Sequence, residues 1–466
     1  MYPIKPFIPS LMNKTVSYLH ITLALICMVL SLMVSMNTLY AQNDSHSKEE
    51  TTDVAIIPGK KLAIFSKKNK AKYYVDVHNG YKTPQSGTIS YQLTTDKGLI
   101  AGTGTTNVTI AAKSKKRIPF TIPVPEVGFY DATFYINLDE YDDTIRSVFG
   151  YRPFDIQLPD NTPFDFDDFW QKAKDDLQAV APNYKVTKDS TMSTPSHKVY
   201  KVEMQSLDNV TVWAWLSIPR VRGNYPVIYG FGGYKIELPP GYSDDFVTFH
   251  INVRGIGNNA KIINPDNKEQ FLLNIEDKNK YVYRGIYMDC LRGLDFLKDS
   301  AAMGFDTTRI AFVGGSQGAT LALITAALSN KACFCIADNP AFCDFTTNYE
   351  IVAPRPEPTI PIKYMLEYFK NRPSISKAGM LNNLRYFEVQ NFAPKVDCPV
   401  LLGAGLKDLM APPTCTFGAF NKLRYPVKTK SEVYVFPSLG HEVTPLHNTY
   451  KSVWIYEHTV KKHKPL

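Results

Sequence analysis

Residues 309–328 read RIAFVGGSQGATLALITAAL. The first six residues form a short apolar run typical of a buried β-strand, and the run from Gln317 to Leu328 is rich in Ala and Leu, which favour a helix. Between them lies Gly-Gly-Ser-Gln-Gly, with Ser316 at its centre. A strand, a glycine-flanked turn and a helix are the setting of a nucleophile elbow, in which a serine hydroxyl stands above a sheet. We therefore predict that Ser316 is a nucleophile; the alternative is a serine that serves only the turn.

Apolar strands and helices alternate on both sides of this turn. Strand-like runs occupy residues 226–231, 246–253, 332–337, 400–404 and 432–436, and helical spacing marks residues 164–180, 281–297 and 443–460. This alternation is typical of a mostly parallel sheet covered on both faces, whose reactive groups lie beyond the carboxyl ends of the strands. Together with the elbow, the pattern predicts an α/β-hydrolase fold for residues 158–466.

The preceding hundred residues show a different pattern. Between residues 51 and 157, apolar and polar residues alternate with period two, in runs separated by turns that contain Asn-Gly, Gly or Pro. This predicts antiparallel strands in an immunoglobulin-like β-sandwich, joined to the rest by a linker at residues 158–163. We expect a packing or spacer domain. A glycan-binding module is the alternative, and it requires exposed aromatic residues, for which the candidates are Tyr81, Phe129 and Tyr141.

The N-terminus has the order of a secretory signal. Lys14 precedes an apolar stretch at residues 21–34, and the small residue Ala41 closes the segment. We predict a signal peptide over residues 1–41, a flexible leader over residues 42–50, and export to the periplasm or the medium. A retained membrane anchor is the alternative, but the apolar stretch is short for a full span.

A serine nucleophile needs a general base, and histidine is the usual one. The histidines that follow Ser316 are His441, His447, His458 and His463. His441 comes shortly after the strand-like run 432–436, at a carboxyl end. The other three fall on or after the last helix, where we expect solvated surface positions. His441 is therefore the predicted base.

The base needs an acid that orients it. Asp408 follows the run 400–404 and precedes His441. Ser, Asp, His is the chain order of the triad in α/β-hydrolases. Asp338, just after the run 332–337, is a rival, and so is Glu442, although adjacent side chains point apart. We predict Asp408.

An oxyanion hole needs two backbone donors. We expect one from Gln317, the residue after the nucleophile, and one from Tyr234, which follows Gly232-Gly233. Arg254 follows the run 246–253 and has two interpretations, a structural bridge to nearby carbonyls or acids, or a direct substrate contact. The Pro-rich segment 354–361, followed by a helical run to residue 370, is a candidate lid over the pocket.

Composition excludes several functions. The formal net charge is +8, but Lys and Arg are interleaved with Asp and Glu, so we predict no nucleic-acid partner. The seven cysteines fit no zinc pattern, and we expect buried free thiols, although export would permit a disulfide. The chemistry predicted for Ser316 requires no metal and no organic cofactor.

These residues and their flanking motifs resemble acetyl xylan esterases and cephalosporin-C deacetylases, carbohydrate esterase family 7. The resemblance runs from about residue 164 to the C-terminus and is carried by Phe166-Asp167-Asp168-Phe169-Trp170, Tyr281-Val282-Tyr283-Arg284, Gly315-Ser316-Gln317-Gly318, Leu384-Arg385-Tyr386-Phe387-Glu388, Asn391-Phe392-Ala393, Gly405-Leu406-Lys407-Asp408 and Gly440-His441-Glu442. Three motifs depart from the family pattern: Arg254-Gly255-Ile256-Gly257, Phe231-Gly232-Gly233-Tyr234 and Gly318-Ala319.

The resemblance implies a serine esterase that removes acetyl groups from acetylated xylo-oligosaccharides, other small acetylated sugars or cephalosporin-type substrates. It implies a triad of Ser316, Asp408 and His441, an oxyanion hole from Tyr234 and Gln317, and a homo-oligomer as one option. The alternatives are a serine peptidase on the same fold and a catalytically idle glycan-binding protein.

Overall fold

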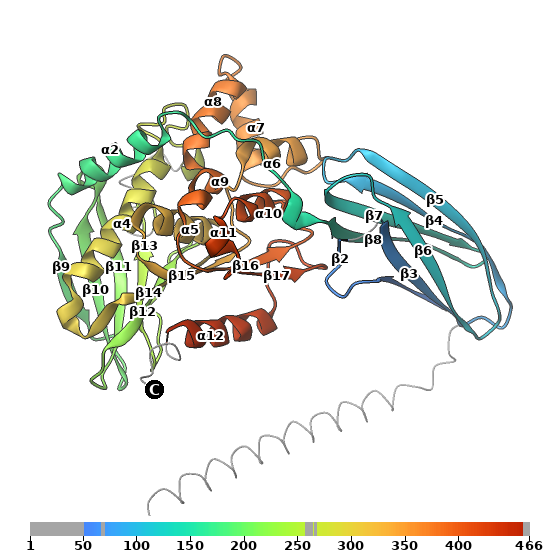
Figure 1. Ribbon diagram of the computed structural model, residues 1–466, viewed down its shortest axis with the longest axis horizontal. Helices are drawn as coiled ribbons and strands as arrows, with labels where there is room; N and C mark the ends of the chain where they lie inside the picture. The colour runs from blue at the N-terminus through green and yellow to red at the C-terminus, as the bar shows by residue number, and fades with distance from the viewer. Residues whose placement is uncertain (1–50, 67–69, 257–263, 265–267, 460–466) are drawn as a thin grey trace, which may run out of the picture. The chain divides into compact units, whose positions relative to one another are not determined.

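The computed structural model describes residues 51–66, 70–256, 264 and 268–459 (Figure 1). The predicted signal peptide and leader lie outside these residues, as do Gly257 and the chain after Thr459. Within the described ranges, no helix has the length and apolar character needed to cross a membrane. The contacts divide the chain into two units, which are described separately.

The smaller unit consists, in its described part, of residues 51–54, 77–85 and 109–116. Its centre is the buried Asn79. The Asn79 amide donates hydrogen bonds to the carbonyl oxygens of Thr83, Ile110 and Ala111, and its Oδ1 accepts one from the Tyr81 amide. One side chain thereby supplies partners to backbone groups at the ends of several strands.

The first part of the chain is all-β. Its strands are β1 (Thr52–Pro58), β2 (Ile64–Phe65), β3 (Lys70–Asn79), β4 (Gln85–Thr95), β5 (Ile100–Ile110), β6 (Lys115–Pro123), β7 (Gly128–Leu138) and β8 (Tyr141–Tyr151). They form sheets of order β1-β3-β6 and β2-β8-β7-β4-β5. The pairs β4–β7 and β7–β8 are antiparallel, and the two-residue strand β2 pairs with β8 in parallel.

Alternating side chains of these strands meet in an aromatic core. The ring of Tyr73, on β3, lies 5.5 Å from that of Phe134 and 5.8 Å from that of Phe149. The predicted all-β sandwich is confirmed. Phe129 was one candidate for an exposed, glycan-binding aromatic residue. This candidate was wrong, because the Phe129 side chain is buried.

The rest of the larger unit alternates strands with helices. Its strands are β9 (Lys185–Asp189), β10 (His197–Gln205), β11 (Thr211–Pro219), β12 (Tyr225–Phe231), β13 (Val247–Asn252), β14 (Phe305–Gly315), β15 (Ala332–Asp338), β16 (Val400–Gly405) and β17 (Glu432–Phe436). Its longer helices are α2 (Phe166–Gln178), α4 (Val282–Asp299), α5 (Gln317–Ser329), α6 (Phe345–Val352), α7 (Ile362–Asn371), α8 (Lys377–Leu384), α10 (Pro413–Asn421) and α12 (Pro445–Thr459).

These strands form one sheet of order β17-β16-β15-β14-β12-β13-β11-β10-β9. The strands from β12 to β17 are parallel to their neighbours, and β9, β10 and β11 add an antiparallel edge. The α/β-hydrolase fold predicted from the alternation is confirmed. Since β14, β15, β16 and β17 are neighbours, the loops that follow them meet at one edge of the sheet.

Both faces of this sheet are covered, as Figure 1 shows for α5 and α12. On one face, Phe312 of β14 packs in the main core with α4 and α5. On the other face, the preceding residue Ala311 packs with Phe334, Leu401 and Trp454, the last of which belongs to α12. Burial on both faces explains why these strands read as continuous apolar runs.

Candidate active site

The turn between β14 and α5 holds Ser316 in a rare backbone conformation with a positive φ, at φ 57° and ψ −123°. Few residues other than glycine adopt positive φ, and such outliers gather at functional sites. The Ser316 amide donates a 2.8 Å hydrogen bond to the carbonyl of Asp338. A Cβ on Gly314 or Gly318 would collide with neighbouring backbone, so the turn requires both glycines. The sharp bend thus lifts the Ser316 hydroxyl above the sheet.

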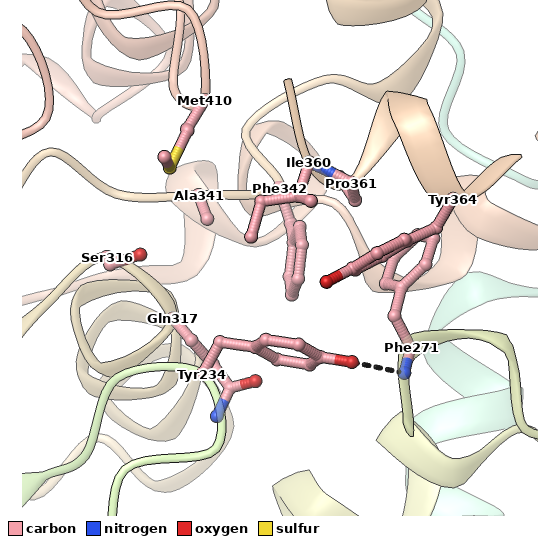
Figure 2. A pocket seen from close by; sticks show the side chains of 10 residues that line it. All are labelled: Tyr234, Phe271, Ser316, Gln317, Ala341, Phe342, Ile360, Pro361, Tyr364 and Met410. Atoms are coloured by element: carbon pink, nitrogen blue, oxygen red, sulfur yellow. Dashed lines mark hydrogen bonds between the residues drawn. The ribbon is translucent and has the colours of Figure 1, made fainter. Parts of the chain in front are cut away.

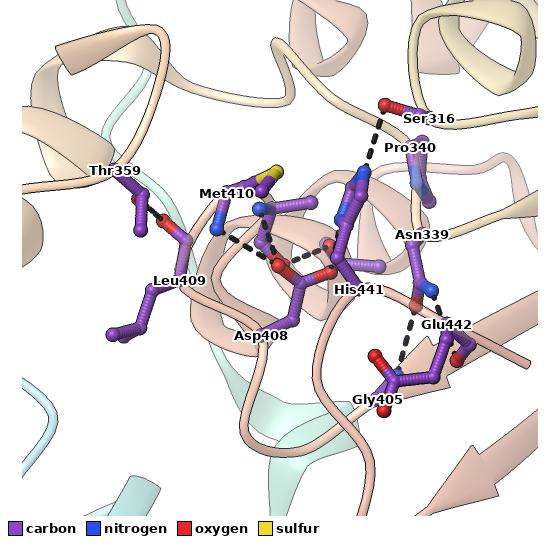
Figure 3. Close-up of polar contacts among 12 residues, drawn as sticks. Ser316, Asn339, Pro340, Thr359, Gly405, Asp408, Leu409, Met410, His441 and Glu442 are labelled. Atoms are coloured by element: carbon purple, nitrogen blue, oxygen red, sulfur yellow. Dashed lines mark hydrogen bonds and ion pairs between the residues drawn. The ribbon is translucent and has the colours of Figure 1, made fainter. Parts of the chain in front are cut away.

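The structure brings Ser316, His441 and Asp408 together (Figure 3). The Nδ1 atom of His441 lies 2.7 Å from Oδ2 of Asp408, and its Nε2 atom lies 2.8 Å from Oγ of Ser316. A carboxylate only accepts hydrogen bonds, so Nδ1 carries the proton and Nε2 accepts from the serine hydroxyl. This is the tautomer in which an imidazole can take the serine proton.

The Asp408 side chain is fully buried. Its second oxygen, Oδ1, accepts hydrogen bonds from the amides of Met410 and Ala411, at 2.8 and 2.9 Å. These two hydrogen bonds replace those to water that the carboxylate loses on burial. They also fix its rotation, because each oxygen has its own partners.

The rival acid, Asp338, has a different partner. Its Oδ1 accepts a 2.7 Å hydrogen bond from His447, and its Oδ2 lies 2.6 Å from Nζ of Lys451. Burial alone would raise the pKa of Asp338, but the His447 hydrogen bond and the charge of Lys451 outweigh burial and lower it. The expectation that His447 is a solvated surface residue was wrong, since α12 packs it fully buried against the sheet.

The two residues predicted to supply oxyanion donors line the same pocket as Ser316. Gln317 is the first residue of α5, where the amide has no partner within the helix and the helix dipole favours negative charge. Tyr234 follows the Gly232-Gly233 turn, and its hydroxyl accepts a 3.0 Å hydrogen bond from the Phe271 amide and donates one of 3.1 Å to Glu269. The ring is therefore fixed at its far end.

A narrow pocket opens beside Ser316, with a cavity volume of about 30 Å³. Figure 2 shows its mainly apolar lining: Tyr234, Phe271, Ser316, Gln317, Ala341, Phe342, Ile360, Pro361, Tyr364 and Met410. Ile360 and Pro361 belong to the Pro-rich segment, and Tyr364 belongs to α7. The candidate lid segment therefore forms one wall of the pocket.

The structure places Arg254 elsewhere. Within the described residues, the lining of this pocket does not include Arg254. Its guanidinium is buried, with 2.8 and 2.9 Å hydrogen bonds to Asp289 and another to the Leu207 carbonyl. Burial alone would lower the pKa of Arg254, but the charge of Asp289 outweighs burial and raises it. This geometry favours the structural interpretation over substrate contact.

No cluster of three or more candidate metal ligands occurs among the residues that the structure describes. The described cysteines are free thiols, buried except for the half-buried Cys333, as expected. Cys335 and Cys398 are in contact, with sulfur atoms 3.6 Å apart.

Sequence reasoning missed several residues around the site. Phe342, Met410 and Tyr364 line the pocket, and Glu269 holds Tyr234, but none was singled out. Met410 and Phe342 do carry a usable signal, because each comes shortly after a predicted strand end. Tyr364 lies in the helical run that follows the Pro-rich segment of the candidate lid, whereas Glu269 carries no signal, since its loop enters the site only through packing.

Comparisons with known proteins find acetyl esterases and acetyl xylan esterases among the relatives of this chain. Over 392 residues the chain is 23% identical to the acetyl esterase Axe7A of Xylanibacter ruminicola, covering 80% of this chain and 84% of that protein. The crystal structure of acetyl xylan esterase 1 from Thermoanaerobacterium sp. superposes with a TM-score of 0.59 at 21% identity, covering 66% of this chain and 98% of that one. The acetyl xylan esterase from Paenibacillus sp. R4 gives a TM-score of 0.58 at 26% identity, covering 65% and 98%.

The sequence profile of the acetyl xylan esterase (AXE1) family matches residues 150–458. This match contains the elbow, Asp408, His441 and the whole parallel sheet, and it spans well over half of the chain. The chain therefore belongs to the acetyl xylan esterase family, and it shares the α/β-hydrolase fold with the two solved acetyl xylan esterases described above.

Proposed function

We propose that this esterase removes acetyl groups from acetylated xylo-oligosaccharides or other small acetylated sugars, with Ser316 as nucleophile. The observation that carries the proposal is the continuous hydrogen-bonded chain from Asp408 through His441 to Ser316, which ends at a narrow apolar pocket. The names of its relatives, acetyl esterase and acetyl xylan esterase, support the same substrate class.

In the first half of the reaction, Nε2 of His441 takes the proton of Ser316 as the serine oxygen attacks the ester carbonyl. Asp408 holds the imidazole and stabilises its charged form. The amides of Tyr234 and Gln317 are the proposed donors to the oxyanion. His441 then gives the proton to the leaving sugar oxygen, and the acetyl group stays on Ser316.

In the second half, water attacks the acetyl-serine ester. His441 takes a proton from this water and returns it to Ser316, which releases acetate. The same two amides would hold the second oxyanion. The sequence of steps consumes one water molecule and regenerates the free enzyme, and it calls on no metal and no organic cofactor.

The size of the pocket favours a short acyl group. The cavity beside Ser316 is small, about 30 Å³, which suits an acetyl group better than a long acyl chain. Ala341, Phe342 and Met410 contribute apolar surface that suits the acetyl methyl group.

Polar groups lie next to the apolar lining. Glu269 accepts hydrogen bonds from Tyr234 and from Lys235, the latter at 3.0 Å, and Tyr364 lies against the same carboxylate. A sugar with free hydroxyl groups can exchange hydrogen bonds with such a rim. The acetyl ester of cephalosporin C has the same small acyl group, and we include it among the proposed substrates.

Acetate release from acetylated xylo-oligosaccharides, other acetylated sugars and cephalosporin C tests the proposal. Ser316→Ala is expected to lower kcat at least about 10³-fold, because it removes the nucleophile. Ser329→Ala, at the far end of the same helix, is the matched control and should retain parental activity. Full activity of Ser316→Ala would refute the role of Ser316.

The two alternatives predict different results. A peptidase would cleave a chromogenic dipeptide amide faster than p-nitrophenyl acetate, whereas the proposal expects the reverse order. An idle glycan-binding protein would bind xylan but release no acetate from any substrate of the panel. Either result would replace the proposed function.

A further inference from the structure

Asn339 is the first residue after β15 and lies beside the Ser316–His441–Asp408 chain (Figure 3). It is buried, and its backbone is left-handed, with φ 45°. Asparagine tolerates this conformation better than most residues other than glycine. The position therefore combines a left-handed backbone with a polar side chain that has little access to solvent.

The backbone at this position is tied to the nucleophile and to the neighbouring strand. The carbonyl of the preceding residue, Asp338, accepts the 2.8 Å hydrogen bond from the Ser316 amide. The Asn339 amide itself donates a 2.8 Å hydrogen bond to the Gly403 carbonyl on β16. A displacement of the backbone at Asn339 would therefore also displace the turn that holds Ser316.

The side chain of Asn339 reaches the other two loops. Its Oδ1 accepts a 2.9 Å hydrogen bond from the buried Gly405 amide, three residues before Asp408. Its Nδ2 donates a longer one, 3.4 Å, to the carbonyl of Glu442, the residue after His441. One amide group thereby contacts both the loop that carries the acid and the loop that carries the base.

The two loops also contact each other, because the Lys407 amide donates a 2.9 Å hydrogen bond to the Leu439 carbonyl. Asn339 adds the connection of both loops to the nucleophile turn. An amide side chain suits this place because it offers an acceptor and a donor in one plane. An aspartate would keep the acceptor for Gly405 but present a second oxygen to the Glu442 carbonyl.

We propose that Asn339 is a positioning residue that sets the nucleophile turn, the acid loop and the base loop in register for catalysis. The inference rests on the proposed function, since it concerns the geometry of that same reaction. Asn339 touches no substrate atom in this account; it acts through Ser316, Asp408 and His441.

Asn339→Gly is the most direct test, because glycine accepts the left-handed backbone and removes only the side chain. We expect kcat for acetyl esters to fall about 10- to 100-fold, as small displacements of reacting groups do, with KM within about twofold of the parent because Asn339 lies outside the pocket lining. Asn339→Asp should also lower kcat, because its second carboxylate oxygen would face the Glu442 carbonyl oxygen without a donor between them.

A second measurement separates positioning from general loss of stability. Ile336→Val, on the same strand, removes one buried methylene and should lower thermal stability with kcat unchanged. In Asn339→Gly, the downfield proton resonance of the His441–Asp408 hydrogen bond should shift or broaden, and in Ile336→Val it should not. This readout applies to any variant that folds, whatever its activity.

The outcomes are distinguishable. If Asn339→Gly keeps parental kcat and an unchanged resonance while Ser316→Ala is inactive, the inference about Asn339 is wrong and the proposed function stands. If Ile336→Val loses as much kcat as Asn339→Gly, stability rather than positioning explains the loss, and the inference is again overturned. If Ser316→Ala is itself fully active, the proposed function fails first.

Discussion

Two backbone amides determine how the Asp408 carboxyl group is turned. Because Met410 and Ala411 both donate to Oδ1, an asparagine side chain at this position would place its carbonyl toward them and its NH2 group toward His441. The imidazole would then have to accept at Nδ1 and carry its proton on Nε2, where it cannot take the serine proton. We expect Asp408→Asn to lower kcat about 10³- to 10⁴-fold with little change in KM.

The control for this variant is Asp397→Asn, an exposed acid at the opposite end of the same strand, β16. It removes one negative charge without touching His441, so its kcat should match the parent. Comparable activity of Asp408→Asn and Asp397→Asn in an acetate-release assay would contradict the orientation argument.

At the same scale, sequence reasoning reached some contacts and not others. Ser316, Asp408 and His441 could be singled out because each follows a recognisable strand and their chain order is restricted by the fold. The pairing of Asp338 with His447 could not, because it depends on how α12 packs against the sheet. Asn339 was missed for a similar reason, since its proposed role depends on hydrogen bonds to loops more than sixty residues away in the sequence.

Among the elements, α7 has the most direct effect on substrate choice. Tyr364 faces the pocket from this helix, while the neighbouring Lys363 is exposed. Tyr364→Ala removes part of one wall, so longer acyl chains should gain access. We expect the ratio of kcat/KM for p-nitrophenyl butyrate over p-nitrophenyl acetate to rise about tenfold, in line with roughly 1–3 kcal/mol for a methylene group in a hydrophobic pocket.

Lys363→Ala is the matched variant on the same helix and should leave this ratio unchanged. If both substitutions shift the ratio equally, the effect belongs to helix stability and not to the pocket wall. The helix was predictable from its spacing and was expected with the candidate lid, whereas the side chain that it presents to the pocket was not, because the Pro-rich segment before it contains no periodic pattern that fixes a direction.

On the scale of the whole molecule, one buried acid connects distant segments. Glu388 is fully buried and accepts hydrogen bonds from the Asn161 side chain at 3.0 Å, the Phe345 amide at 2.8 Å and the Gln390 side chain at 3.0 Å. Burial, with a further contribution from the nearby Asp344, raises the pKa of Glu388 from 4.5 to about 7. The titrating Glu388 carboxyl group therefore connects three segments: the linker, the start of α6 and the segment before β16.

A raised pKa means that the folded protein holds this proton more tightly than the unfolded chain. The resulting stabilisation is complete below about pH 4.5 and is lost as the pH rises through about 7. The free energy of unfolding falls over this range by on the order of 3 kcal/mol. Glu388→Gln cannot titrate, so its free energy of unfolding should fall less between pH 5 and pH 8 than that of the parent. Parallel curves from urea unfolding across this range would contradict the role of Glu388.

The fold of the whole chain was largely predictable, because period-two and strand–helix patterns are strong and local. The domain limits at residues 51, 157 and 158 stay predictions, as do the signal peptide and a homo-oligomer.

The placement of β15 next to β16 has a consequence for the evolution of such enzymes. The two strands are paired directly, yet the chain between them contributes α6, α7, α8 and half of the residues that line the pocket. An insertion or exchange within α6, α7 or α8 lies between neighbouring points of the sheet and leaves Asn339 in place, so it can be accommodated without displacing Ser316, Asp408 or His441. Substrate range can therefore diverge by recombination of one segment while the bond-breaking chemistry is inherited intact.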